Sequence, residues 1–284
     1  MKHSPGRPGE PEKTIMKKPY RAVKRYPCNT AGRDFVVGDL HGCFSHLDAQ
    51  LAELGYDASR DRLFSVGDLV NRGPESPAVL DAVHRHRIKA IKGNHEDMIL
   101  RWLYNDENAE QLMVNGGEWL WKLTGSPELR AICNFMASLP YAIEIECTWG
   151  IVGLLHADAP GDRWDVLTAA LAAEGDRGLT RRKVLWQRSR WREDPPSKNR
   201  TSPGLRELFG LPAEPASDAS TKTHTGPVDG VVAVIVGHTP VPHPLVRGNV
   251  INIDTGAVYG GALTIMDLAD VPKFLANANS IAAA

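Results

Sequence analysis

The segment DFVVGDLHG, residues 34–42, decides the fold class, because a short apolar strand runs directly into a polar loop flanked by glycines. The same pattern recurs in LFSVGDLVNRG, residues 63–73, and in IKAIKGNHE, residues 88–96. After the first loop, apolar residues recur at helical spacing over Cys43–Leu54. Strand, loop and helix in alternation predict an α/β fold built on a sheet with parallel strands.

Polar motifs also follow apolar runs in the second half of the chain. Ala142–Cys147 and Ile151–Leu155 have the pattern of paired strands, and the second leads into HAD, as Val231–Val236 leads into GHTP. Val250–Ile253 and Leu263–Met266 complete the expected strands. Open α/β sheets bind ligands at the carboxyl ends of their strands, so we expect the five polar motifs to converge.

The overall composition is that of an ordinary globular protein. The net charge of -1 gives no field that favours nucleic acid or a membrane surface as partner. No apolar run approaches the roughly 18 residues of a membrane span, and the N-terminus lacks the apolar core of a signal peptide. The four cysteines lie far apart without a CxxC pair, which argues against a disulfide framework. We expect a soluble cytoplasmic protein, and the oligomeric state stays open.

One catalytic domain is expected over residues 31–272. Residues 1–30 are polar, basic and proline-bearing, which is typical of a flexible extension. Residues 193–229 are rich in proline, serine, threonine and charge, and we interpret them as a long surface loop inserted into the domain. Residues 273–284 are expected to form a C-terminal tail.

The five polar motifs carry six residues of the types that bind divalent metal ions. These are Asp39, His41, Asp68, Asn94, His156 and His238. Carboxylate, imidazole and amide oxygen together suit manganese, iron or zinc. No cysteine lies in the motifs, which argues against a closed structural zinc site.

Hydrolysis of a phosphate ester explains why these residue types occur together. Two ions roughly 3.5–4 Å apart can share one hydroxide as nucleophile and also bind the phosphate. Asp68 is the natural candidate for the carboxylate that bridges them. The remaining ligands would be Asp39 and His41 for one ion, and Asn94, His156 and His238 for the other.

The motifs GDLHG, GDLVNRG, GNHE, HAD and GHTP together resemble those of the metallophosphoesterase superfamily, and within it the lambda-type bacterial members of the phosphoprotein phosphatase family. NGGEW at Asn115–Trp119, LWQRSR at residues 185–190 and IDTGAVYGGALT at Ile253–Thr264 extend the resemblance over most of the chain. It implies two β-sheets in a central sandwich flanked by helices, with two metal ions at one edge. It also implies manganese-stimulated hydrolysis of phosphoserine and phosphothreonine in proteins.

The resemblance also implies roles for residues beside the metal ligands. His95 in GNHE would be the general acid, and Arg72 and Arg188 would hold the phosphate oxygens together with Asn94. An alkoxide is a poor leaving group, so a positioned imidazolium should accelerate its departure roughly 10²–10⁴-fold. The planar guanidinium of arginine suits phosphate.

One position departs from the family pattern GDxVDRG, because Asn71 stands where the family has an aspartate. In the family this aspartate pairs with the motif histidine and favours its protonated form. Asparagine can accept a hydrogen bond but lacks the charge that raises the pKa of an imidazole. We therefore expect a working but weaker general acid at His95.

The same position admits an alternative function. Symmetrical diadenosine tetraphosphate hydrolases share the fold and carry a neutral residue there, in a motif close to GDLVNRGPES. NGGEW, HADAP and GHTP favour the protein phosphatase. A non-catalytic descendant that only binds is a third possibility, invited by Asn71 alone. The stretch Trp119–Trp121 could form a wall of the substrate site, but we expect it to pack in the core. Asp254 is expected to be either a turn residue or a support for a ligand.

Overall fold

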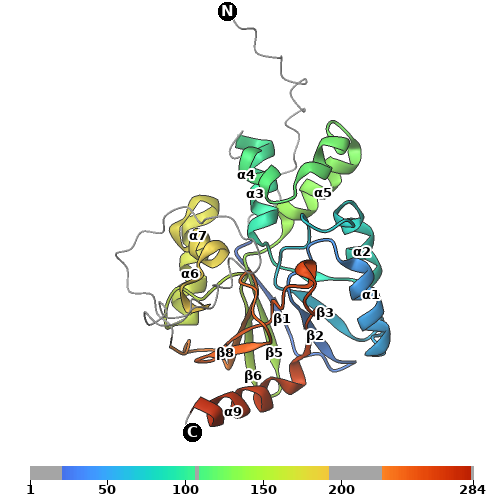
Figure 1. Cartoon of the computed structure of the whole chain (residues 1–284). Helices are drawn as coiled ribbons and strands as arrows, with labels where there is room; N and C mark the ends of the chain where they lie inside the picture. Colours follow the sequence, from blue (N-terminus) through green and yellow to red (C-terminus); the bar gives the residue numbers. More distant parts are fainter. Residues whose placement is uncertain (1–20, 106–108, 192–225, 283–284) are drawn as a thin grey trace, which may run out of the picture.

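The structure is a computed structural model that describes residues 21–105, 109–191 and 226–282. Two β-sheets lie at the centre with helices on both sides (Figure 1). Within these residues, no helix is both long enough and apolar enough to cross a bilayer.

The smaller sheet has four strands in the order β10-β2-β3-β4. β2 (Asp34–Val37), β3 (Arg62–Ser65) and β4 (Lys89–Ala90) are parallel, as their sequence pattern predicts. β10 (Ile265–Asp267) runs antiparallel beside β2. The three parallel strands end at one edge of the sheet, and their polar loops are therefore neighbours.

The larger sheet has six strands in the order β1-β5-β6-β7-β9-β8. They are β1 (Val23–Tyr26), β5 (Ala142–Cys147), β6 (Gly150–Leu154), β7 (Ala233–Val236), β8 (Leu245–Arg247) and β9 (Val250–Asn252). β5 and β6 form the predicted antiparallel pair, and β6, β7 and β9 are parallel. The HAD and GHTP motifs follow the adjacent parallel strands β6 and β7.

Buried apolar side chains join the layers. Val36, Phe64 and Ile91 of the smaller sheet pack in one cluster with Ile143 and Ile235 of the larger sheet. The predicted sandwich of two sheets is therefore confirmed. A second cluster lies between the smaller sheet and the helices α1 (Phe44–Glu53) and α2 (Val79–His86). A third lies between the larger sheet and the helices α6 (Trp164–Glu174) and α7 (Leu179–Trp186).

Helices surround the two sheets, on both sides and at both ends (Figure 1). They are α1 (Phe44–Glu53), α2 (Val79–His86), α3 (Asn94–Asn105), α4 (Ala109–Val114), α5 (Pro127–Ser138), α6 (Trp164–Glu174), α7 (Leu179–Trp186) and α9 (Val271–Ala282). α1 agrees with its predicted range. The 3₁₀ turn η1 (Ser76–Ala78) comes directly before α2, which starts at Val79.

The N-terminal boundary of the domain differs from the prediction. β1 lies inside the range 1–30 assigned to an extension, and it pairs with β5 from Val23 opposite Ala142. The strand was missed because Lys24 and Arg25 point into solvent at the edge of the sheet, so its sequence has no apolar alternation. The described domain therefore starts before the predicted boundary at residue 31.

The predicted tail and the predicted loop can each be compared with the structure over part of their length. The predicted tail at 273–284 falls largely within α9, which continues from the sheet-packed residue Val271. Of the predicted loop at 193–229, residues 193–225 lie outside the described part of the chain. Its last residues are described, and among them Val228 is buried against the larger sheet.

Candidate metal centre

The five polar motifs converge at the carboxyl ends of β2, β3, β4, β6 and β7. The six side chains predicted as ligands are all brought together there, and none is more than 4% exposed: Asp39, His41, Asp68, Asn94, His156 and His238. Polar groups this deeply buried need partners, because burial of an unpaired polar group is costly. The cluster is therefore a built site and not a set of solvated loop residues.

The backbone at this edge is strained. Six described residues other than glycine have a φ in the left-handed region, and five of them lie here: His41, Asp68, Asn71, Arg72 and His238. Such conformations cost about 1–3 kcal/mol each and persist where the surrounding structure enforces them. The strain is concentrated where the motifs meet.

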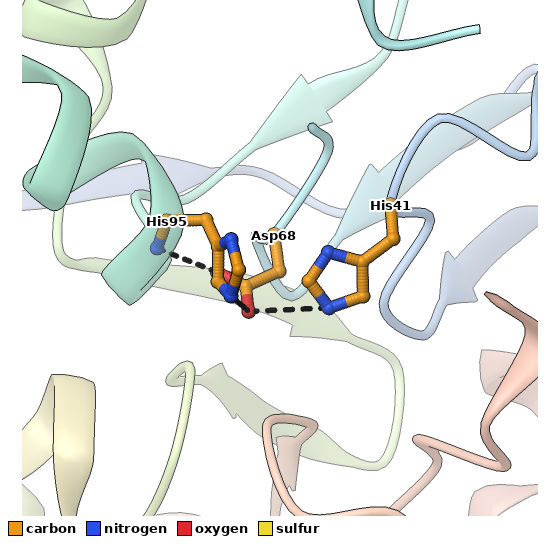
Figure 2. Close-up of side chains that lie close together, drawn as sticks. All are labelled: His41, Asp68 and His95. Atoms are coloured by element: carbon orange, nitrogen blue, oxygen red, sulfur yellow. Dashed lines mark hydrogen bonds and ion pairs between the residues drawn. The ribbon is translucent and has the colours of Figure 1, made fainter. Parts of the chain in front are cut away.

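Asp68 lies at the centre of the cluster. Its Oδ1 is 3.3 Å from His156 Nε2, and its Oδ2 is 3.6 Å from His41 Nε2 and 3.8 Å from His95 Nε2. Figure 2 shows the carboxylate between the rings of His41 and His95. Burial alone would raise the pKa of Asp68, but the surrounding imidazoles, His156 foremost, bring it well below its usual range. An ionised carboxylate that faces several imidazoles suits a bridging ligand.

Backbone carbonyls fix the orientation of two imidazoles. His41 Nδ1 is 3.0 Å from the carbonyl oxygen of Val70, and His156 Nδ1 is 2.7 Å from that of Val66. A carbonyl only accepts, so Nδ1 carries the proton in both rings. Nε2 of each ring is then the nitrogen that faces Asp68, which is the orientation of histidines that bind metal ions.

Three atoms of metal-binding type meet at Asn94. Its Oδ1 lies 2.8 Å from His156 Nε2 and 2.8 Å from His238 Nδ1. Burial alone would lower the pKa of His156, but the charge of Asp68 raises it, so a cation at this point would take the place of a proton. Imidazole nitrogens and an amide oxygen beside a carboxylate are ligands of divalent metal ions, so the residues present fit such an ion. Two groups, His41–Asp68–His95 and Asp68–His156–His238, have the spacing of metal ligands.

Asp39 adds a second carboxylate. It accepts the backbone N–H of His238 through both oxygens, at 3.0 and 3.2 Å, and its Oδ2 is 3.9 Å from His41 Nε2. Burial, and then the charges of Asp254 and Asp68, raise the pKa of Asp39 well above its usual range. Burial also raises the pKa of Asp254 to about 6. Asp254 accepts the N–H of Gly256, as a turn residue does, and it also adds charge to the site.

Glu96 is a residue whose role the sequence analysis missed. Its carboxylate accepts the backbone N–H groups of Asp68 at 3.0 Å, Leu69 at 2.9 Å and Gly93 at 2.8 Å. Burial, followed by the charge of Asp68, raises its pKa to about 7. The signal was its place in GNHE, in the first turn of α3. Gly93 permits the close approach, because a Cβ there would lie 2.2 Å from Asp68 Oδ1.

His95 is fully buried beside the predicted ligands, and burial is the largest cause that lowers its pKa well below the usual range. Its Nδ1 is 3.0 Å from Asn71 Nδ2, while Asn71 Oδ1 accepts the indole N–H of Trp119 at 2.9 Å. In this arrangement the amide nitrogen of Asn71 faces His95 and its oxygen faces Trp119. Trp119 packs against the core as expected, but its indole nitrogen also contacts the site.

The two predicted phosphate-binding arginines both reach the site. Arg72 Nη1 is 2.6 Å from His41 Nε2, and its guanidinium lies 5.5 Å from the centre of the Tyr259 ring. Arg188 Nη1 donates to the carbonyl oxygen of His238 at 2.8 Å and to Thr239 Oγ1 at 3.2 Å. Each is only partly buried, so both line the accessible rim of the cluster.

Comparisons with known proteins agree with this geometry. A model of the family described as calcineurin-like phosphoesterase matches residues 35–242. The chain is 30% identical to serine/threonine-protein phosphatase 1 of Salmonella typhimurium over 88% of this chain and 98% of that protein. It is 26% identical to the symmetrical bis(5'-nucleosyl)-tetraphosphatase of Pseudomonas putida, over 82% and 89% of the two chains.

Solved structures share the fold at lower identity. A cold-active protein-tyrosine phosphatase of a psychrophilic Shewanella species superposes with a TM-score of 0.52 at 17% identity, over 87% of this chain and 78% of that chain. This likeness supports the architecture of two sheets and flanking helices.

Proposed function

Because the chain belongs to the calcineurin-like phosphoesterase family and is a metallophosphoesterase, we propose that it hydrolyses phosphoserine and phosphothreonine in proteins. The observation that carries the proposal is the convergence of buried imidazole nitrogens on the Asp68 carboxylate. Similarity to serine/threonine-protein phosphatase 1 over nearly its whole length supports the substrate class.

The proposed ligands divide into two sets that share Asp68. One set is Asp39, His41 and Asp68, and the other is Asp68, Asn94, His156 and His238. When bound, two divalent ions supply a nucleophile from water at neutral pH and positive charge beside the phosphoryl oxygens. Manganese is the proposed metal, with iron or zinc as alternatives, since the ligands are of nitrogen and oxygen type.

The chain's own residues would bind and orient the phosphate. Arg72 contacts His41 and Arg188 contacts His238, and their guanidinium groups suit the oxygens of a phosphate. Asn94 would assist them. His95 would direct its Nε2 at the leaving oxygen, because that nitrogen points to the centre of the cluster.

We also propose a reducing compartment, the cytoplasm, for this protein. All four cysteines lie in the described part of the chain and are free thiols. Burial raises the pKa of Cys133 to about 12, so this thiol is unreactive at neutral pH.

A symmetrical dinucleoside tetraphosphatase is the second candidate function. Asn71 favours it, because a neutral residue at this position suits a leaving group that departs without a proton. The similarity to the Pseudomonas putida tetraphosphatase covers most of both chains, although at lower identity.

A side-by-side assay tests the proposal. The manganese-loaded protein is given a phosphoserine peptide and diadenosine tetraphosphate, and kcat/KM is compared. We expect the peptide to be preferred, and Asp68→Asn to abolish both activities while the exposed Asp165→Asn leaves them unchanged. Preference for the dinucleotide would replace the protein phosphatase with the second candidate.

A further inference from the structure

Two large apolar side chains are exposed on either side of the segment that contacts Arg72. The segment is Asn115–Trp119, and Asn115 Oδ1 accepts a hydrogen bond from Arg72 Nη2 at 3.3 Å. Val114, one residue before the segment, is 65% exposed, and Trp121, two residues after it, is 52% exposed. Both apolar side chains are therefore attached to a segment that touches a residue proposed to bind phosphate.

Trp121 is exposed although the sequence predicts that the stretch Trp119–Trp121 packs in the core. Trp119 and Leu120 do pack against the core cluster, whereas Trp121 stands on the outer side of the 3₁₀ turn η2 (Glu118–Leu123). A 3₁₀ helix has three residues per turn, so three consecutive side chains point in three directions and cannot all reach the core. The prediction is therefore wrong for Trp121.

A second tryptophan supports the ring of Trp121. Trp121 packs edge-to-face on Trp102, with ring centroids 5.2 Å apart and an angle of 90° between the rings. Trp102 is half-buried and packs against the core. The helices α3 and α4, which carry Trp102 and Val114, lie side by side (Figure 1). We call the surface formed by Trp102, Val114 and Trp121 the apolar rim.

The apolar rim lies within reach of a peptide whose phosphate is bound at the cluster. α3 starts at the predicted ligand Asn94, and Trp102 comes eight residues later in the same helix. At a rise of 1.5 Å per residue, Trp102 is about 12 Å from Asn94 along the helix axis. An extended peptide covers this distance in about four residues, at roughly 3.3 Å for each.

We propose that the apolar rim selects phosphoprotein substrates that carry an apolar side chain about four residues from the phosphorylated residue. The inference rests on the proposed function and deepens it, because it names the class of peptide that the site prefers. The phosphate itself is the same in every phosphoserine, so the residues that bind it cannot distinguish one peptide from another. Sequence preference has to come from the surface beyond them, and the apolar rim is such a surface.

Burial of an apolar side chain on the rim stabilises the bound peptide. A leucine that is about half-buried against this surface should improve binding roughly tenfold, compared with a polar residue of similar size. The rim does not contact the reacting atoms, so it binds the ground state and the transition state equally well. The gain is therefore expected in KM, with kcat unchanged.

Pairs of phosphoserine peptides test the proposal. The two peptides of a pair differ only by leucine or asparagine at one position, and the series moves this position from one to five residues away on either side of the phosphoserine. For the manganese-loaded, full-length wild type, we expect kcat/KM to favour leucine roughly tenfold at about four residues on one side. Trp121→Ala should bring this ratio close to one.

Two further variants make the comparison specific to the rim. Val114→Asn should also lower the ratio, because it replaces an exposed apolar side chain of the rim with a polar one. Val166→Ala is the matched control, since Val166 is 55% exposed but stands on α6, which packs on the larger sheet. It should keep the wild-type ratio. A merely structural role of Trp121 would lower kcat/KM equally for both peptides of a pair, which overturns the proposal.

The outcomes separate this inference from the proposed function. Equal turnover of the leucine and asparagine peptides at every position by the wild type would overturn the inference alone, because the phosphatase activity is then still present. Turnover of diadenosine tetraphosphate without turnover of any phosphopeptide would overturn both. If Trp121→Ala lowered the dinucleotide activity and left the peptide ratio unchanged, the rim would bind a nucleobase, and the proposal would again be overturned.

Discussion

Glu96 illustrates at the residue scale how one carboxylate holds two loops of the site together. Its oxygens accept three backbone N–H groups, two from the loop of Asp68 and one from Gly93 before Asn94. The distance between the predicted bridging ligand and the predicted amide ligand therefore depends on a side chain that is not itself a predicted ligand.

Glu96→Gln should destabilise this arrangement. Glutamine presents an NH₂ group to at least one of the N–H donors, and a buried donor without an acceptor costs about 1–3 kcal/mol. We expect a loss of that size in urea unfolding, together with weaker manganese binding by calorimetric titration.

Glu118→Gln is the control for this variant, since it makes the same substitution at an exposed position. If Glu96→Gln unfolds at the wild-type urea concentration, Glu96 is protonated or poorly seated in the folded protein, and its proposed bracing role is wrong.

At this scale the sequence predicted residue types better than it predicted contacts. The six candidate ligands could be named because each stands in a short motif after an apolar strand. The contact of Trp119 with Asn71 joins residues 48 positions apart, and nothing in local spacing indicates it. The direction of an amide depends on its partners in the folded protein, so the donor role of Asn71 became visible only there.

Among the elements, the end of β6, the 3₁₀ turn η4 (Ser189–Trp191) and the strand β8 are joined by one buried ion pair. Arg190 Nε donates to Asp158 Oδ1 at 2.7 Å, and both side chains are fully buried. Arg190 Nη1 also donates to the carbonyl oxygens of Gly226 at 2.8 Å and Arg247 at 3.4 Å. The pair thus fixes the elements that flank the Arg188 motif.

Asp158→Ala should therefore be strongly destabilising. It leaves the Arg190 guanidinium buried without its counter-charge, and breaking a buried pair in this way costs about 3–5 kcal/mol. Urea unfolding followed by far-UV circular dichroism measures the loss.

Asp165→Ala removes half of the exposed pair between Arg163 and Asp165 and serves as the matched control, with no measurable loss expected. Equal effects of the two substitutions would show that Asp158 and Arg190 are not coupled in solution.

The elements that could be predicted are those with a clear period or a motif at their end. β2, β3, β5 and β6 belong to this group, as does α1 with its apolar residues on one side. α6 was not predicted, because the sequence WDVLTAALAAE is apolar around most of the helix and has no distinct period. β1 has no apolar alternation either, but there the cause is that charged residues stand in this strand at the edge of the sheet.

At the scale of the whole molecule, buried carboxyl groups are concentrated at one edge of the two sheets. Burial is the first cause that raises the pKa of Asp254 from 3.8 to about 6 and that of Glu96 from 4.5 to about 7. Folded pKa values above the unfolded ones mean that the metal-free folded chain retains protons. The stability that these two groups contribute is full below about pH 4 and is lost as the pH rises to about 7.

Metal binding should reverse this loss, because a cation replaces the retained protons. We expect manganese to raise the melting temperature of the chelator-treated protein more at pH 7.5 than at pH 5.5. The difference should exceed about 2 °C, the shift that roughly 1 kcal/mol produces in a protein of this size.

Differential scanning fluorimetry at both pH values, with and without manganese, measures these shifts. Asp68→Asn should show no gain at either pH. An equal gain at the two pH values would mean that the metal displaces no protons and that the carboxyl groups are already ionised in the metal-free protein.

The sheet order has a consequence for synthesis on the ribosome. Asp39 and His238 face one another across 199 positions, and β10, near the C-terminal end, pairs with β2. At about 5–20 residues per second, roughly 10–40 s separate the translation of these two residues. The nascent chain therefore exposes an incomplete metal site and an unpaired edge of β2 throughout that interval. The complete set of ligands can bind metal only near the end of synthesis.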